Sequence, residues 1–442
     1  MYDVLQKIEA AGIVGAGGAG FPSHVKAKCR AEILIANGAE CEPLLVVDQC
    51  VMRDHPAEIV AGMRAVMQAT GATKGVLCTK AHYHDAVAAL RETFKGQDDL
   101  SLKLFDSTYP AGDEQVMVYE VTGRVVPTGG LPIDVGAVVF NVSTLKNISD
   151  ALNGIPVTEK TVTVAGEVKT PMTLTVPIGT PIQALIDLAN GPKQAEGFVS
   201  ILGGPCMGIL ERDWNVPVTK TTGGIIVIRE DHPLVFTKTD DLQRDIKLAK
   251  AVCCQCSLCT QMCPRNALGL KVEPHKAMRA AANGNGMLLG DVNGVFSCCA
   301  CGLCTYYACN FGLNPSAMMV RMKDGLARAG VKPVKRTAYP VASDYAMKKL
   351  PVMRLESRLG LTSFETDAPY TDAAIPVNRV VIPLKMHIGA PSEAVVTAGE
   401  RVVKGQMIAK IPEGKLGANI HASIGGTVEA VDAVGIVIRR MV

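Results

Sequence analysis

The sequence CCQCSLCTQMCP, at residues 253–264, is followed by a second cysteine run, CCACGLCTYYAC, at residues 298–309. The first run has the spacing Cys-x2-Cys-x2-Cys-x3-Cys-Pro, and the second has Cys-x2-Cys-x2-Cys-x4-Cys. A cubane iron–sulfur cluster needs a soft thiolate at each iron corner, and three cysteines at this spacing can curl around one cluster. The two runs therefore predict two [4Fe–4S] clusters and a protein that transfers single electrons.

The spacing also predicts which cysteines share a cluster. In two-cluster proteins the displaced fourth cysteine of one run ligates the other cluster. We expect one cluster to be held by Cys253, Cys256, Cys259 and Cys309. We expect the second to be held by Cys298, Cys301, Cys304 and Cys263. Cys254 and Cys299 do not fit the spacing and are expected to be spare thiols.

Zinc is the main alternative ligand for these cysteines. The pairs Cys256-x2-Cys259 and Cys301-x2-Cys304 could together form a zinc site of four thiolates. Such a site would leave the outer cysteines without a function, so the complete pattern favours the clusters. A disulfide framework is less favoured still, because it is typical of short secreted chains.

Length and composition limit the remaining possibilities. A chain of 442 residues is long enough for three or four domains. The formal net charge of +3 does not suggest a nucleic-acid partner. Fifteen cysteines without a signal peptide indicate a reducing cytoplasm. Glycines and prolines interrupt the long uncharged stretches, so we expect no transmembrane segment.

The pattern of apolar and turn-forming residues divides the chain into five parts. Residues 1–155 alternate β-rich apolar runs with helical patterns, which predicts an α/β domain. Residues 156–232 read as a small β-rich module, and residues 233–325 contain both cysteine runs. The long insert between the runs favours a helical cluster domain. Residues 326–375 read as a linker, and residues 376–442 are β-rich and punctuated by glycine.

A second motif, GAGGAGFP, occupies residues 15–22. Closely spaced glycines let backbone N–H groups approach a phosphate, and the following SHVKAK can open a helix that favours the same anion. The run also matches the GxGxxG dinucleotide pattern, but that pattern should follow a strand, whereas residues 2–11 look helical. For the glycine run in isolation, a plain structural turn is the alternative.

Three other segments, ANGAECEP (36–43), YPAGDE (109–114) and FNVST (140–144), favour the phosphate site. With the glycine loop they resemble the flavin- and NADH-binding subunit of respiratory complex I. Over nearly its whole length the chain resembles more closely the RnfC family of electron-transport proteins and the PduS-type cobalamin reductases of propanediol-utilisation microcompartments. The β-rich segment at the C-terminus of this chain is similar to the barrel-sandwich hybrid domain that RnfC carries at its N-terminus. The C-terminal position of this segment favours the cobalamin-reductase arrangement.

The resemblance implies a multidomain α/β protein. In chain order it predicts a complex I-like flavin domain, a soluble-ligand-binding β-grasp (SLBB) module, a dicluster [4Fe–4S] domain and a barrel-sandwich hybrid domain. It also implies non-covalently bound FMN, with its phosphate at the glycine loop. The cofactor-binding residues carried over from the family are Gly15, Gly17, Gly18, Gly20, Phe21, Lys26, Asn37, Glu40, Glu42, Tyr109, Gly112, Asp113, Glu114, Asn141 and Thr144.

The chain departs from the complex I pattern at three positions. Ala27 stands where that family has a tryptophan, Ala39 replaces an acidic residue, and Cys41 replaces a glycine. These changes bear on the geometry of NADH binding more than on FMN binding. Near the C-terminus, Lys415 lies close to the turn where biotinyl and lipoyl domains carry a modified lysine, but its flanking residues differ. A docking or structural role is therefore favoured for that domain.

The cofactors imply a redox function. A nicotinamide delivers two electrons as hydride, clusters accept one at a time, and a flavin can do both. The resemblance thus implies an enzyme that passes electrons from NADH through FMN and two clusters to a corrinoid, in support of a B12-dependent diol dehydratase. No catalytic side chain is expected. Partners would be cobalamin, its adenosyltransferase and a microcompartment shell.

Three other functions remain open from the sequence. One is an RnfC-type subunit of a membrane NADH:ferredoxin oxidoreductase, which would need partner subunits at the membrane. Another is an electron shuttle of a glycyl-radical microcompartment. The third, of another class, is an iron–sulfur electron-carrying scaffold without catalysis of its own.

Overall fold

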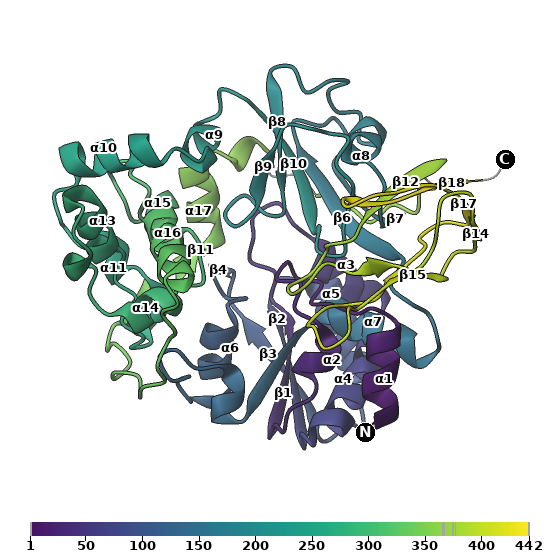
Figure 1. Cartoon of the computed structure of the whole chain (residues 1–442). Coiled ribbons are helices and arrows are strands. Elements are labelled where there is room, and N and C mark those ends of the chain that lie inside the picture. The colour runs from purple at the N-terminus through teal and green to yellow at the C-terminus, as the bar shows by residue number, and fades with distance from the viewer. Residues whose placement is uncertain (1, 365–366, 374, 376, 441–442) are drawn as a thin grey trace.

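The fold is taken from a computed structural model that describes residues 2–364, 367–373, 375 and 377–440. Figure 1 shows an N-terminal domain, a central module, a helical cysteine domain at one side and a β-rich C-terminal domain at the other. We use these four names for residues 2–152, 159–229, 233–328 and 379–439, respectively. No helix of the described residues has both the length and the apolar character needed to cross a bilayer.

The N-terminal domain contains a four-stranded parallel sheet in the order β3-β2-β1-β5. Successive residues of β1 face opposite sides: Leu34 packs in the core that contains α4 and α7, whereas Ile35 packs with α6. A strand buried on both faces reads as a continuous apolar run, as β1 does. The elements are α1 (Tyr2–Ala10), α2 (Ser23–Lys26), β1 (Ile33–Gly38), α3 (Val47–Asp54), α4 (Pro56–Thr70), β2 (Lys74–Lys80), α5 (His84–Thr93), β3 (Leu100–Phe105), β4 (Thr108–Tyr109), α6 (Glu114–Thr122), β5 (Ala137–Asn141) and α7 (Val142–Leu152).

The central module is a five-stranded sheet in the order β7-β6-β10-β8-β9, covered by α8. Only β10 and β6 pair in parallel, and the other neighbours are antiparallel. Its elements are β6 (Glu159–Gly166), β7 (Met172–Pro177), α8 (Ile182–Leu188), β8 (Phe198–Leu202), β9 (Ile209–Glu211) and β10 (Gly224–Arg229).

The cysteine domain is built from short helices. Every residue from 233 to 328 is described, and none of them belongs to a strand, which confirms the helical preference predicted from the spacing of the cysteine runs. Its α-helices are α9 (Pro233–Lys238), α10 (Leu242–Val252), α11 (Leu258–Gln261), α12 (Pro264–Ala267), α13 (Pro274–Asn283), α14 (Val292–Phe296), α15 (Leu303–Tyr306) and α16 (Pro315–Arg328).

The predicted linker at residues 326–375 is more structured than the sequence suggested. The short strand β11 (Leu350–Pro351) pairs with β4 of the N-terminal domain, and α17 (Val352–Leu359) follows it. The helix buries Val352, Leu355 and Leu359 in a core shared with the central module. This segment therefore ties the cysteine domain back onto the domains that precede it. Residues 365–366 and 374 of the predicted linker lie outside the described residues.

The C-terminal domain consists of two small sheets, ordered β12-β18-β17-β14 and β13-β15-β16. The predicted first residue of this domain, 376, and its last two, 441–442, lie outside the described residues. Its strands are β12 (Arg379–Pro383), β13 (Glu393–Ala394), β14 (Arg401–Val402), β15 (Met407–Lys410), β16 (Ile420–His421), β17 (Gly426–Val431) and β18 (Gly435–Arg439).

The C-terminal domain docks behind the glycine loop. The two domains share one hydrophobic core, and Ile388 donates its backbone N–H to the carbonyl oxygen of Gly20 at 3.0 Å. Lys220 of the central module joins both, because its Nζ donates to the carbonyl oxygens of Gly12 and Asn419 at 2.6 Å each. The glycine loop is thus supported by three parts of the chain.

Candidate functional site

The first cysteine run forms a cavity at the edge of the cysteine domain. Cys253 follows α10, Cys259 lies on α11, and Cys309 lies three residues after the end of α15. The predicted first set, Cys253, Cys256, Cys259 and Cys309, lines this one cavity together with His275, Met278 and Phe311.

The second cavity is lined by the other predicted set, Cys263, Cys298, Cys301 and Cys304. Cys263 caps the N-terminus of α12 in the first run, and it joins the three cysteines of the second run. The displaced cysteine of each run therefore lies with the other run, as the spacing predicts. Arg265, two residues after Cys263, also lines this cavity.

The backbone explains how each run folds around its cavity. Gln255 and Ser257 in the first run have φ values of 58° and 61°, and Ala300 and Gly302 in the second have 57° and 76°. These residues occupy equivalent positions between the cysteines of the two runs. A residue with left-handed backbone angles turns the chain sharply. Two such residues, one on each side of the middle cysteine, can bring three cysteines toward one point.

The geometry of the thiols fits a cluster better than a single ion. In the described part of the chain, no three His, Cys, Asp or Glu side chains converge closely enough to hold one metal ion. Tetrahedral zinc would need its sulfurs within about 2.3 Å of one point. Two separate cavities, each lined by four thiols, suit two cubane clusters. Cluster ligation by these eight cysteines stays a prediction.

The two cavities differ in their access to solvent. Cys301 and Cys304, which line the second cavity, are only 8% and 7% exposed. In the first run, Cys254 and Cys256 are exposed. The first cavity is therefore the outer one, and the second is the inner one.

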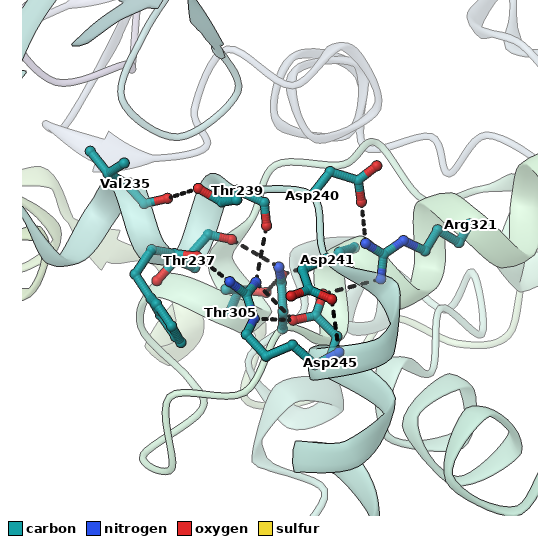
Figure 2. Close-up of polar contacts among 12 residues, drawn as sticks. Val235, Thr237, Thr239, Asp240, Asp241, Asp245, Thr305 and Arg321 are labelled. Atoms are coloured by element: carbon teal, nitrogen blue, oxygen red, sulfur yellow. Dashed lines mark hydrogen bonds and ion pairs between the residues drawn. The ribbon is translucent and has the colours of Figure 1, made fainter. Parts of the chain in front are cut away.

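Polar contacts hold the first part of the cysteine domain, residues 233–252, to its later helices (Figure 2). Arg321 of α16 pairs with Asp240, and its Nη1 lies 3.1 Å from Oδ2 of Asp245 on α10. Asp245 also pairs with Arg244 at 3.0 Å. Thr305, next to Cys304, donates to Asn314 Oδ1 at 3.0 Å, so the network reaches the wall of the inner cavity.

The glycine loop forms a closed turn on the N-terminal domain. Gly15 donates its N–H to the carbonyl oxygen of Phe21 at 2.9 Å, and Ala16 donates to Thr144 Oγ1 at 2.9 Å. A Cβ at Gly17 would lie 3.2 Å from Nδ2 of Asn141. Gly18 has a φ of 110° and open space where a Cβ would be. A loop with open space in front of a glycine backbone fits a phosphate cradle.

Lys26 lies at the end of α2, close to this loop. Its Nζ is 3.5 Å from Oε2 of Glu114 and 5.6 Å from the centroid of the Phe140 ring. The helix predicted after the loop is only the four-residue α2. The ammonium group of Lys26 is therefore a stronger candidate for phosphate binding than the end of that helix.

A group of buried ionisable residues lies beneath the loop. Glu40 Oε2 accepts the backbone N–H of Asp48 at 3.1 Å, and burial together with the Asp48 charge raises the pKa of Glu40 to about 8. Burial raises the pKa of Asp48 to about 6, although Asn141 Nδ2 donates to its carboxylate at 2.7 Å. Lys160 of the central module donates from Nζ to the carbonyl oxygen of Ala16 at 2.7 Å, and burial lowers its pKa to about 8.

Two predicted flavin residues reach toward other domains. Glu42 accepts the backbone N–H groups of Cys206 and Met207, at 2.7 and 3.0 Å, from the central module. Tyr109 is 2% exposed, and its hydroxyl donates to the carbonyl oxygen of Cys301 at 2.5 Å. The flavin segments at residues 36–43 and 109–114 also contact each other, since Asn37 Nδ2 donates to the carbonyl oxygen of Gly112 at 2.9 Å.

Asp113 forms a buried ion pair with Arg265, which lines the inner cavity. Its Oδ2 lies 2.8 Å from Nη2 of Arg265, and the two side chains are 4% and 10% exposed. Its Oδ1 accepts the backbone N–H groups of Gln115 and Val116 at 3.0 Å each and so caps α6. Burial raises the pKa of Asp113, but the charge and hydrogen bond of Arg265 outweigh this and lower it overall. Both carboxylate oxygens are thus already bonded within the protein.

Comparison with known proteins identifies relatives over the full length. The chain is 40% identical to the cobalamin reductase PduS of Salmonella typhimurium over 440 residues, which cover 99% of this chain and 96% of that protein. The chain belongs to the PduS cobalamin reductase family. PduS of Citrobacter freundii is 38% identical, with 100% of this chain and 98% of that protein covered. A component of the Na⁺-translocating ferredoxin:NAD⁺ oxidoreductase complex of Acetobacterium woodii is 34% identical, over 58% of this chain and 56% of that protein.

Family matches along the chain agree with the predicted order of domains. Residues 8–150 match the Nuo51 FMN-binding domain, and residues 161–210 match the SLBB domain. Residues 252–314 match the 4Fe-4S dicluster domain, and residues 363–441 match the RnfC barrel sandwich hybrid domain. The predicted multidomain fold, with an FMN-binding domain and a dicluster domain, is confirmed. The protein is an oxidoreductase of the flavin and iron–sulfur class.

Sequence reasoning missed several polar residues of the site. Arg265 directly follows the Cys-Pro pair of the first run, and Lys160 and Lys220 lie in a module with no site motif. Asp48 lies five residues beyond the segment used for the resemblance. A charged residue beside a ligand motif, as at Arg265, was the one available signal. Cys299, expected to be a spare thiol, lies close enough to Asp113 and Cys301 to affect the pKa of both groups.

Proposed function

We propose that this protein is an NADH-dependent cobalamin reductase that carries electrons to a corrinoid through FMN and two [4Fe–4S] clusters. The observation that carries the proposal is the pair of four-cysteine cavities, the inner one in contact with the FMN-binding domain. Full-length relatedness to PduS supports the corrinoid as acceptor. When bound, FMN takes up a hydride and releases electrons singly, and the clusters carry single electrons.

The glycine loop and its neighbours would hold the flavin. The open backbone at Gly18 and the ammonium group of Lys26 suit its phosphate, while Thr144 accepts the N–H of Ala16 and holds the loop in position. The buried Lys160 adds a positive charge beneath the loop and the Glu40–Asp48 pair adds acidic groups. Fixed charges beside a flavin tune how easily it is reduced.

Contacts between domains support an order for the two cavities. Tyr109 and Asp113, on the flavin segment 109–114, bond to the backbone of Cys301 and to Arg265 at the inner cavity. Both bonds hold the inner cavity close to the FMN-binding domain. The outer cavity is farther along the cysteine domain and opens to solvent at Cys256. We therefore infer that the outer set lies on the acceptor side.

We infer the cellular setting from the resemblance noted in the sequence. It implies a place inside a bacterial microcompartment that degrades propanediol, with an adenosyltransferase and the shell as partners. A role within a membrane complex is less favoured, because the match to the Acetobacterium woodii protein spans 58% of this chain, against 99% for PduS.

Anaerobic spectroscopy tests the proposal. The reconstituted protein is mixed with NADH, and flavin bleaching, cluster reduction and cobalamin reduction are followed in turn. All three should occur. Flavin that stays oxidised in excess NADH would remove NADH as donor, and reduced clusters with unreactive cobalamin would remove the corrinoid as acceptor.

A matched pair of glycine variants tests the flavin site. Gly18→Val fills the open space in front of the loop and should abolish FMN binding while iron content is unchanged. Gly96→Val is the control, because Gly96 also has a positive φ, of 74°, with open space around it, and lies in no flavin segment. Retention of FMN by Gly18→Val would contradict the assignment of the loop.

A further inference from the structure

The cysteine domain is more basic than the rest of the chain. Residues 233–328 contain eleven Lys and Arg against six Asp and Glu, a net charge of +5. The remaining residues contain 34 against 36, a net charge of −2, which together give the +3 of the whole chain. Such an asymmetry creates a local positive potential that the total charge conceals.

Part of this charge lies beside the outer cavity. Lys247 and Lys250 are exposed on α10, the helix that ends at Cys253. Arg279 is exposed on α13, next to Met278, which lines the cavity. None of these three side chains forms an ion pair with another described residue. Their charge is therefore available to a partner.

Apolar and sulfur atoms are also exposed at the outer cavity and beside it. Phe311 lines the outer cavity and is 51% exposed, and Val252, beside Cys253, is 38% exposed. Cys256 is exposed as well. In Figure 1, α10, α11 and α13 form the outer edge of the cysteine domain, away from the sheet of the N-terminal domain. We call the surface of Lys247, Lys250, Val252, Arg279 and Phe311 the basic port.

We propose that the basic port docks an acidic electron-transfer protein, which takes electrons from this chain one at a time. The proposal rests on the proposed function, because it assumes a cluster in the outer cavity, and the partner protein would be an acceptor in addition to the corrinoid. Charge complementarity selects the partner: three exposed cations without an ion pair lie on α10 and α13, the helices that carry Cys253 and Met278 to the outer cavity. A protein with acidic residues around its own redox centre would therefore approach in a productive orientation. Each transfer oxidises this protein by one electron and reduces the partner by one, with no bond made or broken.

The port differs from a site for a small acceptor. The cavity behind it is lined by the four cysteines and would be filled by their cluster. The charges are spread over two helices instead of converging on a pocket. Spread charge of this kind steers a macromolecule and raises its association rate by about 10 to 10³-fold at low salt.

Charge reversal tests the proposal with acidic flavodoxin as the probe. The full reconstituted protein is reduced with dithionite, and the second-order rate of electron transfer is measured by stopped flow at low and high salt. The triple variant K247E/K250E/R279E should lower the rate with flavodoxin at least tenfold at low salt. The rate of the unchanged protein should itself fall as salt rises. Interferometry should show the same loss in the binding of flavodoxin.

Two controls separate docking from damage. K74E/K169E/K415E makes the same charge change on exposed lysines of the other three domains and should stay within twofold of the unchanged protein. Menadione, an uncharged acceptor, should react equally with all variants. A flavodoxin rate that resists reversal, or that falls equally with menadione, or a preference for basic cytochrome c, would overturn the proposal. Because dithionite replaces NADH, a failure of NADH to reduce the protein would refute the proposed function and leave this test intact.

Discussion

The buried ion pair between Asp113 and Arg265 offers a test of how the FMN-binding domain is joined to the inner cavity. Asp113→Asn removes the negative charge but keeps an oxygen that can cap α6. Arg265 would then remain 10% exposed and without a carboxylate in ion-pair contact, although the charge of the more distant Glu114 would still act on it. Its other hydrogen bond, from Nη1 to the carbonyl oxygen of Ser297 at 2.8 Å, cannot balance that charge.

The size of the effect follows from the burial of the pair. Removing one partner of a buried ion pair costs about 3–5 kcal/mol, because the other charge stays desolvated. This lost free energy weakens the contact between α6 and the cysteine domain, because Asp113 caps α6 and Arg265 belongs to the cysteine domain. A loss of about 3 kcal/mol increases the open population at that contact by about 100-fold. Asp113→Ala should cost about 1 kcal/mol more, because the cap is lost too.

Hydrogen–deuterium exchange measures this opening directly. In Asp113→Asn, amides of α6 and α12 should exchange about 100-fold faster, while those of the C-terminal domain stay unchanged. The double variant Asp113→Asn/Arg265→Met should recover most of the protection, because no unpaired charge remains. Unchanged exchange in the single variant, or no recovery in the double variant, would refute the assignment of this pair as the joint between the two domains.

Three further predictions concern the cofactor sites and the support of the glycine loop. Cys259→Ala should lose about half of the iron bound after reconstitution, whereas Cys254→Ala should keep all of it; iron analysis decides, and full iron in Cys259→Ala would contradict the ligand set. Lys26→Ala should weaken FMN binding by about 10 to 100-fold in a fluorescence titration, because a hydrogen bond to a charged group contributes about 1.5–3 kcal/mol. Burial lowers the pKa of Lys220 to about 7. Between about pH 7 and pH 10.4 the unfolded state therefore carries a proton on Lys220 that the folded state has lost, and the free energy of unfolding rises by up to about 1.4 kcal/mol per pH unit. Lys220→Met should lose that gain; urea titrations of both proteins at two pH values within the window measure it, and an equal rise in both would show the assignment to be wrong.

The spacing of residues along the chain was enough for several conclusions. Three cysteines at two-residue intervals define a ligand set because the chain between them is too short to place them far apart. The apolar run of β1 and the segments around it predicted strands and helices that the structure contains, including α4 and α5. The glycine loop and its three partner segments indicated an FMN-binding domain through their resemblance to the complex I subunit, whereas the glycines alone left a plain structural turn as an alternative.

Polar residues in loops were harder to assign. Asp113 was predicted as a flavin-lining residue, but a carboxylate in a loop can be solvated, bind a cofactor or pair with a distant cation. Its partner, Arg265, lies 152 residues away in the sequence. Lys160 and Glu40 likewise meet only because the central module packs on the N-terminal domain. Local spacing carries no information about such pairs.

The sequence by itself thus determined the cofactor types and the order of the domains and predicted the cysteine sets, because each of these depends on motifs of residues close together in the chain. Only the tertiary structure decided which cavity faces the FMN-binding domain and which opens to solvent. It also decided that the segment after the cysteine domain returns to pair with β4. These features depend on the packing of domains that are far apart in the sequence, and their contacts arise from the shape and burial of whole surfaces.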